Sequence, residues 1–544
     1  MSQQRLSKVM IEQLSKWGVE HIYGYAGDTI LKFFSELKDS PIKLYTTKNE
    51  AAAGLMASAE SKLKGQLSVC LADGGPGTTN ILNGVADAYS DRAPMLLITG
   101  QVESWNMGTN YEQFIKQMNL TDSLTVYSAL VTNPESIVDL LVKAMTKAIV
   151  EGGVSHLVIP MDMWDKEVNA QARDYLPHLD ELRLPDDELI NQSVELINQA
   201  QKPMILYGRG AKGCREELLE FANKINGGLI STLAAKGMIE YNQQLYLGGL
   251  GHAGNEKADN LLKEADLVII LGATWWPMDS VPRNPRIIQL DAIKENIGMT
   301  HPVEVGVLGE LKSSLQLLLE KVSAKNNQEW RAKVEGTREL LLTKLSREYD
   351  NNQTGICPKE VMKSLANILG EDEIITLDSG DNVVWFAKYF SKRCEEVLIS
   401  GKWRTMGFAL PAALVAKINY PQKPVTCIIG DGGIAMVLAE LLTAKRYNLP
   451  VRIIVMNNGV LAMERNKMLS ANLKEEEVNL SNPDFIKLAE SCGIKGMRAE
   501  SVEELDYILN QHQDMTETIL IDVVTAAPVP AGTKLESRKV IELV

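Results

Sequence analysis

The stretch GDGGIAMVLAELLTAKRYNLPVRIIVMNN, residues 430–458, determines the architecture of the last third of this chain. An apolar run at 425–429 precedes its first glycine, and a second apolar run at 451–456 precedes its two asparagines. The pattern predicts a strand, a glycine turn, a helix and a second strand, with oxygen-bearing side chains where both strands end. Asp431 supplies a carboxylate and Asn458 an amide oxygen, beside glycine N–H groups at the start of the helix. This combination suits a diphosphate that carries a hard divalent cation.

Composition places the whole chain among globular proteins and excludes several classes. It has 544 residues, with 45% hydrophobic and 23% charged side chains, which is enough for several domains with cores of their own. A net charge of −14 without a basic block excludes a nucleic-acid partner. Scattered cysteines without a CxxC pair indicate reduced thiols, and the N-terminus lacks the features of a signal peptide. Because the apolar runs are too short to span a membrane, we expect a cytoplasmic protein.

Three α/β blocks follow one another along the chain, at 1–165, 186–325 and 356–525. In each block apolar runs alternate with helical segments, which predicts a parallel sheet. The segment 67–100 repeats the layout of 425–458, namely strand, glycine turn, helix and strand. The expected fold class is therefore α/β, with three doubly wound parallel-sheet domains. In the third block the predicted strands lie in EIITLD, VTCIIGD, VRIIVMN and TILIDVV.

The GDG turn, followed by a helix, a strand and Asn-Asn, resembles the signature of enzymes that use thiamine diphosphate (ThDP). Two similar domains flanking a third resemble the group of pyruvate oxidase, quinone-linked pyruvate dehydrogenase and acetohydroxyacid synthase. The resemblance covers nearly the whole chain. It implies that 1–165 binds the ThDP pyrimidine, that 356–525 binds the diphosphate, and that 186–325 is a central domain of dinucleotide-binding type.

For the metal, the resemblance implies that Mg²⁺ is held by the Asp431 carboxylate, the Asn458 side chain and the Val460 carbonyl. Diphosphate oxygens and a water would complete the octahedron that Mg²⁺ prefers. Taken alone, Asp431 could equally be a helix N-cap. The backbone would approach the diphosphate at Gly430, Gly432 and Gly433.

Glu50 is the catalytic candidate. From the residues alone it is a carboxylate in the first turn of a helix. The resemblance implies that it hydrogen-bonds N1′ of the pyrimidine, so that the 4′-imino nitrogen can remove the proton at C2 of the thiazolium. Met406 would be the bulky residue that bends the cofactor, although methionine is also ordinary core filler. The Arg404 carbonyl would accept from the 4′-amino group.

The remaining cofactor and substrate residues are predicted from the same resemblance. The pyrimidine pocket would include a glycine turn, which could also be only a helix start; its residues are Gly27, Gly75, Pro76, Gly77 and Asn80. Met463 would lie over the thiazolium. Phe114 keeps the family pattern at a substrate-facing position, while other residues at such positions depart from it, and the charged ones could instead face solvent. The substrate candidates are Asn49, Phe114, Ile115, Glu464 and Lys467.

The central block resembles the flavin-binding domain of pyruvate oxidases, but family members also carry another nucleotide there, or none. An FAD site is therefore an optional prediction. Its candidate residues are Gly208, Gly210, Gly251, His252, Gly272 and Asp291.

The resemblance implies a ThDP- and Mg²⁺-dependent enzyme that decarboxylates a 2-oxo acid such as pyruvate. The best match is to the pyruvate oxidase branch, which implies electron transfer to flavin. Two alternatives are transfer to a second carbonyl, as in a carboligase such as acetolactate synthase, and protonation, as in a non-oxidative decarboxylase. A non-catalytic subunit with the same fold is a further alternative, which the presence of Glu50, Asp431 and Asn458 disfavours. Since family sites combine two facing subunits, we expect a homodimer or homotetramer.

Overall fold

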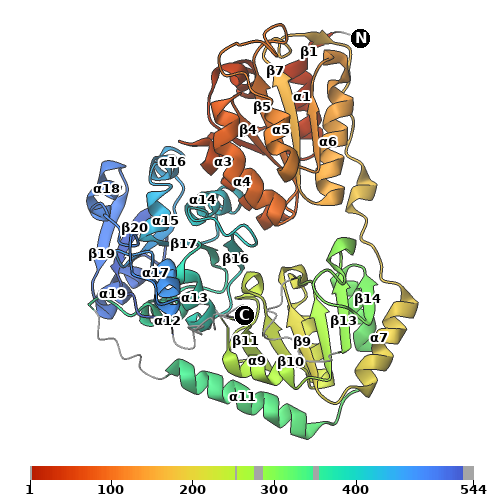
Figure 1. Cartoon of the computed structure of the whole chain (residues 1–544), viewed down its shortest axis with the longest axis vertical. Helices are drawn as coiled ribbons and strands as arrows, with labels where there is room; N and C mark the ends of the chain where they lie inside the picture. Colours follow the sequence, from red (N-terminus) through yellow and green to blue (C-terminus); the bar gives the residue numbers. More distant parts are fainter. Residues whose placement is uncertain (1–2, 252–253, 275–285, 347–353, 531–544) are drawn as a thin grey trace, which may run out of the picture.

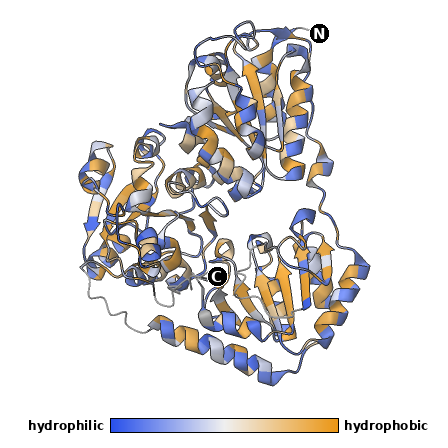
Figure 2. Ribbon diagram, in the orientation of Figure 1, coloured by the Kyte–Doolittle hydropathy of each residue, from blue (hydrophilic) through white to orange (hydrophobic). Residues whose placement is uncertain are grey.

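The computed structural model describes residues 3–251, 254–274, 286–346 and 354–530. Figure 1 shows three α/β bodies along the chain, each built on a six-stranded sheet whose strands pair in parallel. Figure 2 shows that hydrophobic residues follow the strands, as expected for sheets buried on both faces. The expectation of three doubly wound α/β domains is confirmed. The predicted boundaries at 1–165, 186–325 and 356–525 stay predictions.

The N-terminal sheet has the order β3-β2-β4-β5-β7-β6. Along β4, alternate side chains enter two different cores, because successive residues of a strand point to opposite faces. Helices α1 and α6 cover one face, while α3 and α4 cover the other. The strands are β2 (His21–Gly24), β3 (Lys43–Thr46), β4 (Ser68–Ala72), β5 (Met95–Gln101), β6 (Tyr127–Leu130) and β7 (Val154–Pro160), and the helices are α1 (Leu6–Lys16), α2 (Leu31–Leu37), α3 (Glu50–Lys64), α4 (Pro76–Ser90), α5 (Gln117–Thr121) and α6 (Ile137–Glu151).

The central sheet has the order β11-β10-β9-β12-β13-β14. Its strands are β9 (Pro203–Tyr207), β10 (Gly228–Ser231), β11 (Tyr246–Gly249), β12 (Leu267–Leu271), β13 (Arg286–Asp291) and β14 (Val305–Leu308). Its helices are α7 (Asp187–Gln199), α8 (Arg215–Ile225), α9 (Glu256–Lys263) and α10 (Leu311–Lys321). The long helix α11 (Gln328–Ser346) then runs along the outside of this domain toward the third one (Figure 1).

The C-terminal sheet has the order β16-β15-β17-β18-β20-β19. The helix expected between the glycine turn and β18 is divided in two, α15 and α16, with residues 436–439 between them. The strands are β15 (Ile374–Leu377), β16 (Glu396–Ile399), β17 (Val425–Gly430), β18 (Arg452–Asn457), β19 (Lys495–Ala499) and β20 (Ile519–Val524), and the helices are α12 (Pro358–Ile368), α13 (Asp381–Tyr389), α14 (Ala409–Asn419), α15 (Asp431–Ala435), α16 (Glu440–Arg446), α17 (Ala462–Ser470), α18 (Phe485–Ser491) and α19 (Val502–Gln511).

The N-terminal and C-terminal domains share a hydrophobic core. Helix α3 of the first packs against α4 of the same domain and against α14 of the third, and side chains of all three helices belong to one buried cluster. In the part of the chain that the structure describes, no helix is both long and apolar enough to cross a membrane. The shared core fixes where Glu50, at the start of α3, lies relative to the glycine turn.

Candidate active site

The predicted metal ligands meet at one edge of the C-terminal sheet. Strands β17 and β18 are direct parallel neighbours, with Gly430 opposite Met456, so their ends place Asp431 and Asn458 side by side. Asp431 is buried, with 3% of its surface exposed. Burial raises the pKa of Asp431, although hydrogen bonds to its carboxylate oppose the shift. A bound cation would therefore stabilise the charged form of this buried carboxylate.

The backbone around Asn458 is arranged as the ligand prediction requires. The Asn458 Oδ1 atom accepts the Val460 N–H at 3.1 Å, which fixes the side chain over the turn. Val460 forms an antiparallel bridge with Asn479, and its two hydrogen bonds come from the N–H groups of Leu461 and Leu480. The bridge therefore does not use the Val460 carbonyl. This donor set of carboxylate, amide and carbonyl oxygens fits Mg²⁺.

Close contacts explain the glycines of the turn. A side chain at Gly433 would place its Cβ 1.9 Å from Asp378 Oδ2. At Gly432 the Cβ would lie 2.9 Å from Leu461 Cδ2 and 3.1 Å from Met406 Cε. Met406 thus reaches the glycine turn that is predicted to hold the diphosphate. Its role as the residue that bends the cofactor stays a prediction that this proximity supports.

Sequence reasoning missed two residues that hold this site. Asn482 donates its Nδ2–H groups to Asp431 Oδ2 at 2.8 Å and to Asn457 Oδ1 at 3.1 Å. Asp378 follows β15 and accepts the N–H groups of Gly407 at 3.0 Å and Phe408 at 2.8 Å. The end of β15 beside β17 was a signal for Asp378, because polar residues at such strand ends often face ligands. Asn482 lies in a loop, and the sequence around it carries no such signal.

The contribution of Asp378 to the free energy of unfolding increases as the pH falls. Burial raises its pKa from the usual value to about 6, against the hydrogen bonds that it accepts. Since the folded pKa exceeds the unfolded one, its stabilising contribution is complete near pH 4 and is lost as the pH rises through 6. Between these values the contribution changes by about 1.4 kcal/mol per pH unit. We expect the urea midpoint of the wild type to rise, relative to that of Asp378→Asn, when the pH is lowered from 6.5 to 4.5; equal pH slopes would contradict this assignment.

Glu50 begins α3 and faces the second glycine turn of the N-terminal domain. Its Oε2 atom accepts from Asn80 Nδ2 at 3.2 Å, and its Oε1 atom lies 3.3 Å from where a Cβ of Gly77 would be. The preceding Asn49 caps the helix, since its Oδ1 accepts the Ala51 N–H at 2.7 Å. Asn49 therefore has a structural role that was not anticipated when it was predicted to face substrate.

The glycines of the predicted pyrimidine pocket are also required by contacts. Gly75 has φ +58°, and its Cβ would lie 2.6 Å from the Gln113 carbonyl. At Gly27 and Gly77 a Cβ would meet the buried Asp73 at 2.2 and 2.9 Å respectively. Pro76 and Asn80 are exposed at the start of α4.

The segment that carries Phe114 and Ile115 lies over the Gly75 turn. The preceding Gln113 has φ +60° and meets that turn, while the Ile115 carbonyl accepts from Gln101 Nε2 at 3.0 Å. Phe114 and Ile115 are both half-buried. The structure thus brings these two predicted substrate residues next to the pyrimidine pocket.

Glu464 and Lys467 of α17 face solvent. Glu464 and Lys467 pair with each other at 2.8 Å, with 54% and 63% of their side chains exposed. Their exposure favours the alternative that both are surface residues. Met463, which precedes Glu464 in α17, is half-buried. The contact of Met463 with the thiazolium stays a prediction.

The predicted FAD residues lie at the carboxyl edge of the central sheet, but their glycines have another explanation. A Cβ at Gly208 would lie 2.4 Å from the Gly272 carbonyl, and one at Gly210 would lie 2.7 Å from Gly272 Cα. Asp291 is buried and its Oδ1 accepts from Ile293 and Asn296. Gly251 has φ +71°, and its N–H donates to Asp259 Oδ1 at 3.3 Å. His252 lies outside the described residues. The FAD site at this edge stays a prediction.

Hydrogen bonds connect the two domains that carry the predicted half-sites. The Lys48 N–H, two residues before Glu50, donates to Glu440 Oε1 of α16 at 3.0 Å. On the other side, Asn83 of α4 donates to Thr405 Oγ1 at 3.0 Å, next to Met406. The start of α3 and the glycine turn thus lie on two contacting domains.

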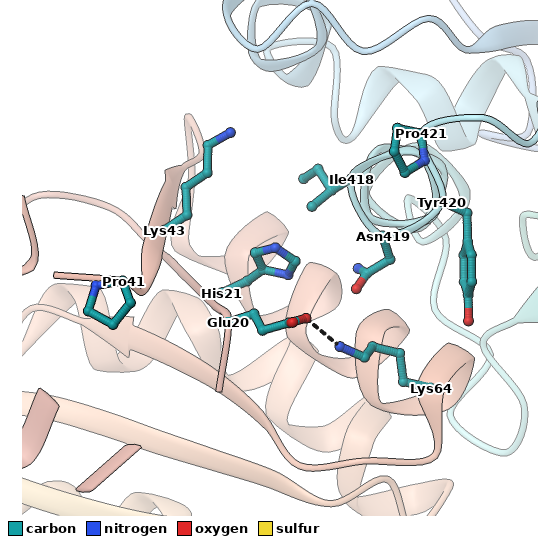
Figure 3. A pocket seen from close by; sticks show the side chains of 9 residues that line it. All are labelled: Glu20, His21, Pro41, Lys43, Lys64, Ile418, Asn419, Tyr420 and Pro421. Carbon is teal, nitrogen blue, oxygen red and sulfur yellow. Dashed lines mark hydrogen bonds and ion pairs between the residues drawn. The ribbon is translucent and has the colours of Figure 1, made fainter. Parts of the chain in front are cut away.

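An open cavity of about 490 Å³ also lies between these domains. Figure 3 shows His21 facing Asn419 across it, with Glu20 paired to Lys64. None of the predicted cofactor or metal residues is among those that line it. It is therefore separate from the candidate active site.

Comparison with known proteins identifies the family. Three models match successive parts of the chain: the N-terminal TPP binding domain of thiamine pyrophosphate enzymes at 4–120, their central domain at 190–318 and their C-terminal TPP binding domain at 378–523. The chain belongs to the thiamine pyrophosphate enzyme family.

Relatives along the whole length carry different names. A thiamine pyrophosphate-containing protein of Bacillus subtilis is 32% identical over 98% of this chain and 94% of its own. The acetolactate synthase large subunit of Corynebacterium glutamicum is 30% identical over 95% of this chain and 86% of its own. The pyruvate oxidase of Lactiplantibacillus plantarum is 26% identical over 96% of this chain and 89% of its own. ThDP is therefore the cofactor of the family, while its members differ in the reaction named.

Proposed function

We propose that this protein is a cytoplasmic ThDP- and Mg²⁺-dependent enzyme that decarboxylates a 2-oxo acid such as pyruvate. The observation that carries the proposal is the pairing of two sites in one fold. Asp431 and Asn458 meet at one sheet edge, and Glu50 faces a glycine turn on the domain packed against it. The relatives support two outcomes, oxidation as in pyruvate oxidase and carboligation as in acetolactate synthase.

The residues present divide the work between the two domains. When bound, ThDP would supply the nucleophilic carbon and the electron sink that decarboxylation of a 2-oxo acid needs. Asp431, Asn458 and the Val460 carbonyl would hold Mg²⁺ and thereby the diphosphate. Glu50 would hold a proton at N1′ of the pyrimidine, while the Arg404 carbonyl accepts from the 4′-amino group. Phe114 and Ile115 would border the space for substrate.

Product analysis separates the two outcomes. The holoenzyme is incubated with pyruvate, with and without an artificial electron acceptor, and the absorption spectrum of the purified protein is recorded. Oxidation predicts a flavin absorption band at about 450 nm, reduction of the electron acceptor and an oxidised acetyl product. Carboligation predicts that acetolactate forms from pyruvate without the electron acceptor. If pyruvate is consumed under neither condition while ThDP is bound, the proposed substrate class is wrong.

We also propose that the active enzyme is a homodimer or homotetramer whose sites combine two chains. Apolar side chains beside the glycine turn support a second copy: Met436 and Leu442 are 64% and 42% exposed on the surface of α15–α16.

Mixing two inactive variants tests this assembly. If Glu50 of one chain serves the cofactor held by Asp431 of another, refolded mixtures of Glu50→Gln and Asp431→Asn chains regain roughly a quarter of wild-type activity, because half the dimers are mixed and each has one intact site. If both residues serve the same cofactor from one chain, the mixture stays inactive. The two variants kept separate are the matched controls.

A further inference from the structure

A buried charge cluster joins the helix that begins with Glu50 to the loop that ends with Met406. Lys62, in the last turn of α3, has only 4% of its surface exposed. Its Nζ atom lies 2.7 Å from Asp87 Oδ2 and 2.6 Å from Asp91 Oδ2, and it donates to the Ile399 carbonyl at 3.3 Å. Charges buried in this way are costly unless each is paired, so this arrangement is held only where the partners are fixed.

One face of α4 follows this loop along its length. Asn83, Asp87 and Asp91 are spaced four residues apart, which puts them on the same side of the helix. Asp87 accepts from Ser400 Oγ at 2.6 Å, and Asp91 accepts the N–H groups of Gly401 and Lys402, both at 2.8 Å.

The contact continues to the neighbouring residues of the loop. Asn83 binds both sides of it, because its Oδ1 accepts from Trp403 Nε1 at 2.8 Å while its Nδ2 donates to Thr405 Oγ1 at 3.0 Å. Ser400 Oγ, which Asp87 orients, in turn accepts the Thr405 N–H at 3.0 Å. Every residue from 400 to 405 except Arg404 thus has a hydrogen bond to α4 or to a group that α4 holds.

The residue left out is the one with unusual backbone geometry. Arg404 has φ +55°, a left-handed conformation that is unfavourable for a residue with a side chain. Such a conformation persists only where the surroundings impose it, and it is often found at functional sites. The bonds from α4 hold the loop before Arg404, and Asp378 holds it after Met406 through Gly407 and Phe408.

We propose that Lys62, Asp87 and Asp91 are positioning residues that set the Arg404 carbonyl and the Met406 side chain against the cofactor. The two carboxylates orient the loop, and Lys62 pairs with both of them inside the domain interface. This inference rests on the proposed ThDP function. It adds that α3 acts at both ends, with Glu50 at its first residue and Lys62 in its last turn.

The alternative is that the cluster only attaches one domain to the other. The two explanations differ in what is lost first. A merely structural cluster would lower stability and cofactor affinity together. A positioning cluster lets ThDP bind through Asp431 while the angle between the cofactor rings is wrong, so that proton exchange at C2 of the thiazolium slows without a matching loss of affinity.

The test measures both quantities on the holoenzyme in Mg²⁺. Hydrogen–deuterium exchange at C2 of bound ThDP is followed by NMR, and ThDP affinity is followed by calorimetry, in Asp91→Asn, Lys62→Met and Lys62→Arg. We expect exchange to fall at least about tenfold in Asp91→Asn and Lys62→Met, since small misplacements cost up to about 100-fold, while affinity stays within about threefold. Lys62→Arg keeps the charge and should recover most of the exchange rate.

Two further variants keep the test decisive. Ser400→Ala removes one hydroxyl and should slow exchange to a smaller extent, even if the charge variants do not fold. Glu304→Gln removes an exposed carboxylate paired with Arg286 in the central domain and should leave both quantities unchanged. Exchange within about twofold of wild type in both Asp91→Asn and Ser400→Ala would overturn the proposal. If wild-type protein does not bind ThDP, or Glu50→Gln exchanges normally, the proposed function has failed instead.

Discussion

Replacing Glu50 by Gln is expected to slow proton exchange at C2 of bound ThDP at least about 100-fold, the lower range for a lost acid–base group. The amide keeps the size of the carboxylate and can still accept from Asn80, which now donates to Glu50 at 3.2 Å. It cannot carry the proton that N1′ of the pyrimidine must share. The change should therefore remove the chemistry and leave the fold of α3 intact. Exchange is measured by NMR after quenching in acid.

The matched control is Glu151→Gln, which neutralises an exposed carboxylate of the same domain that pairs with Lys147. It should exchange at the wild-type rate. ThDP affinity of Glu50→Gln should change little, because the diphosphate is held by the other domain. If Glu50→Gln exchanged as fast as the control, the role of Glu50 would be refuted, although membership of the family would stand.

The three sheets could be predicted because their central strands are short apolar runs between glycines and helices. In the C-terminal domain the four predicted strands became β15, β17, β18 and β20. The two edge strands were missed. β19 reads KGMRA, of which only Ala499 is buried, so it carries no apolar run from which a strand could be predicted. Such strands exist because a neighbour offers hydrogen bonds, as β20 does for β19, and this information lies elsewhere in the chain.

The same distinction holds in the candidate site. Asp431 and Asn458 were predictable because each directly follows a strand, and adjacent parallel strands end at one edge. Asn482 is 51 residues away from Asp431 in the chain, and only the fold brings them within 2.8 Å. Lys62 appeared in the sequence as one more lysine in a helix. Its burial between two aspartates depends on how α3, α4 and the loop at 400–405 pack.

Glu464 and Lys467 of α17 show what a motif leaves open. The sequence placed them either at the substrate entrance or in solvent, because they occupy positions where relatives carry apolar residues. In the structure their three-residue spacing lets them pair on the exposed side of the helix. Position relative to a motif therefore predicted the helix correctly, but which side of the helix faces the site depends on packing.

Replacing Asp431 by Asn is expected to weaken ThDP binding in Mg²⁺ at least about 100-fold, as when a metal ligand or its immediate support is lost. The carboxylate accepts from Gly432 at 2.9 Å, Gly459 at 2.7 Å and Asn482 at 2.8 Å, all of them donors. An amide placed here keeps one acceptor and turns an NH₂ group toward a donor in a buried site. It also removes the negative charge that would attract the cation. Calorimetric titration with ThDP in Mg²⁺, and again with EDTA, measures the loss.

Two comparisons make this prediction specific. Asp514→Asn, at an exposed position of the same domain, should bind ThDP like the wild type. Because burial raises the pKa of Asp431, protons compete with the cation at a higher pH than for an exposed aspartate. Wild-type affinity in Mg²⁺ should therefore fall as the pH is lowered, and Asp431→Asn should lack the part of that dependence which this carboxylate supplies. An Asp431→Asn variant that bound ThDP with wild-type affinity and pH dependence would show that the metal is held elsewhere.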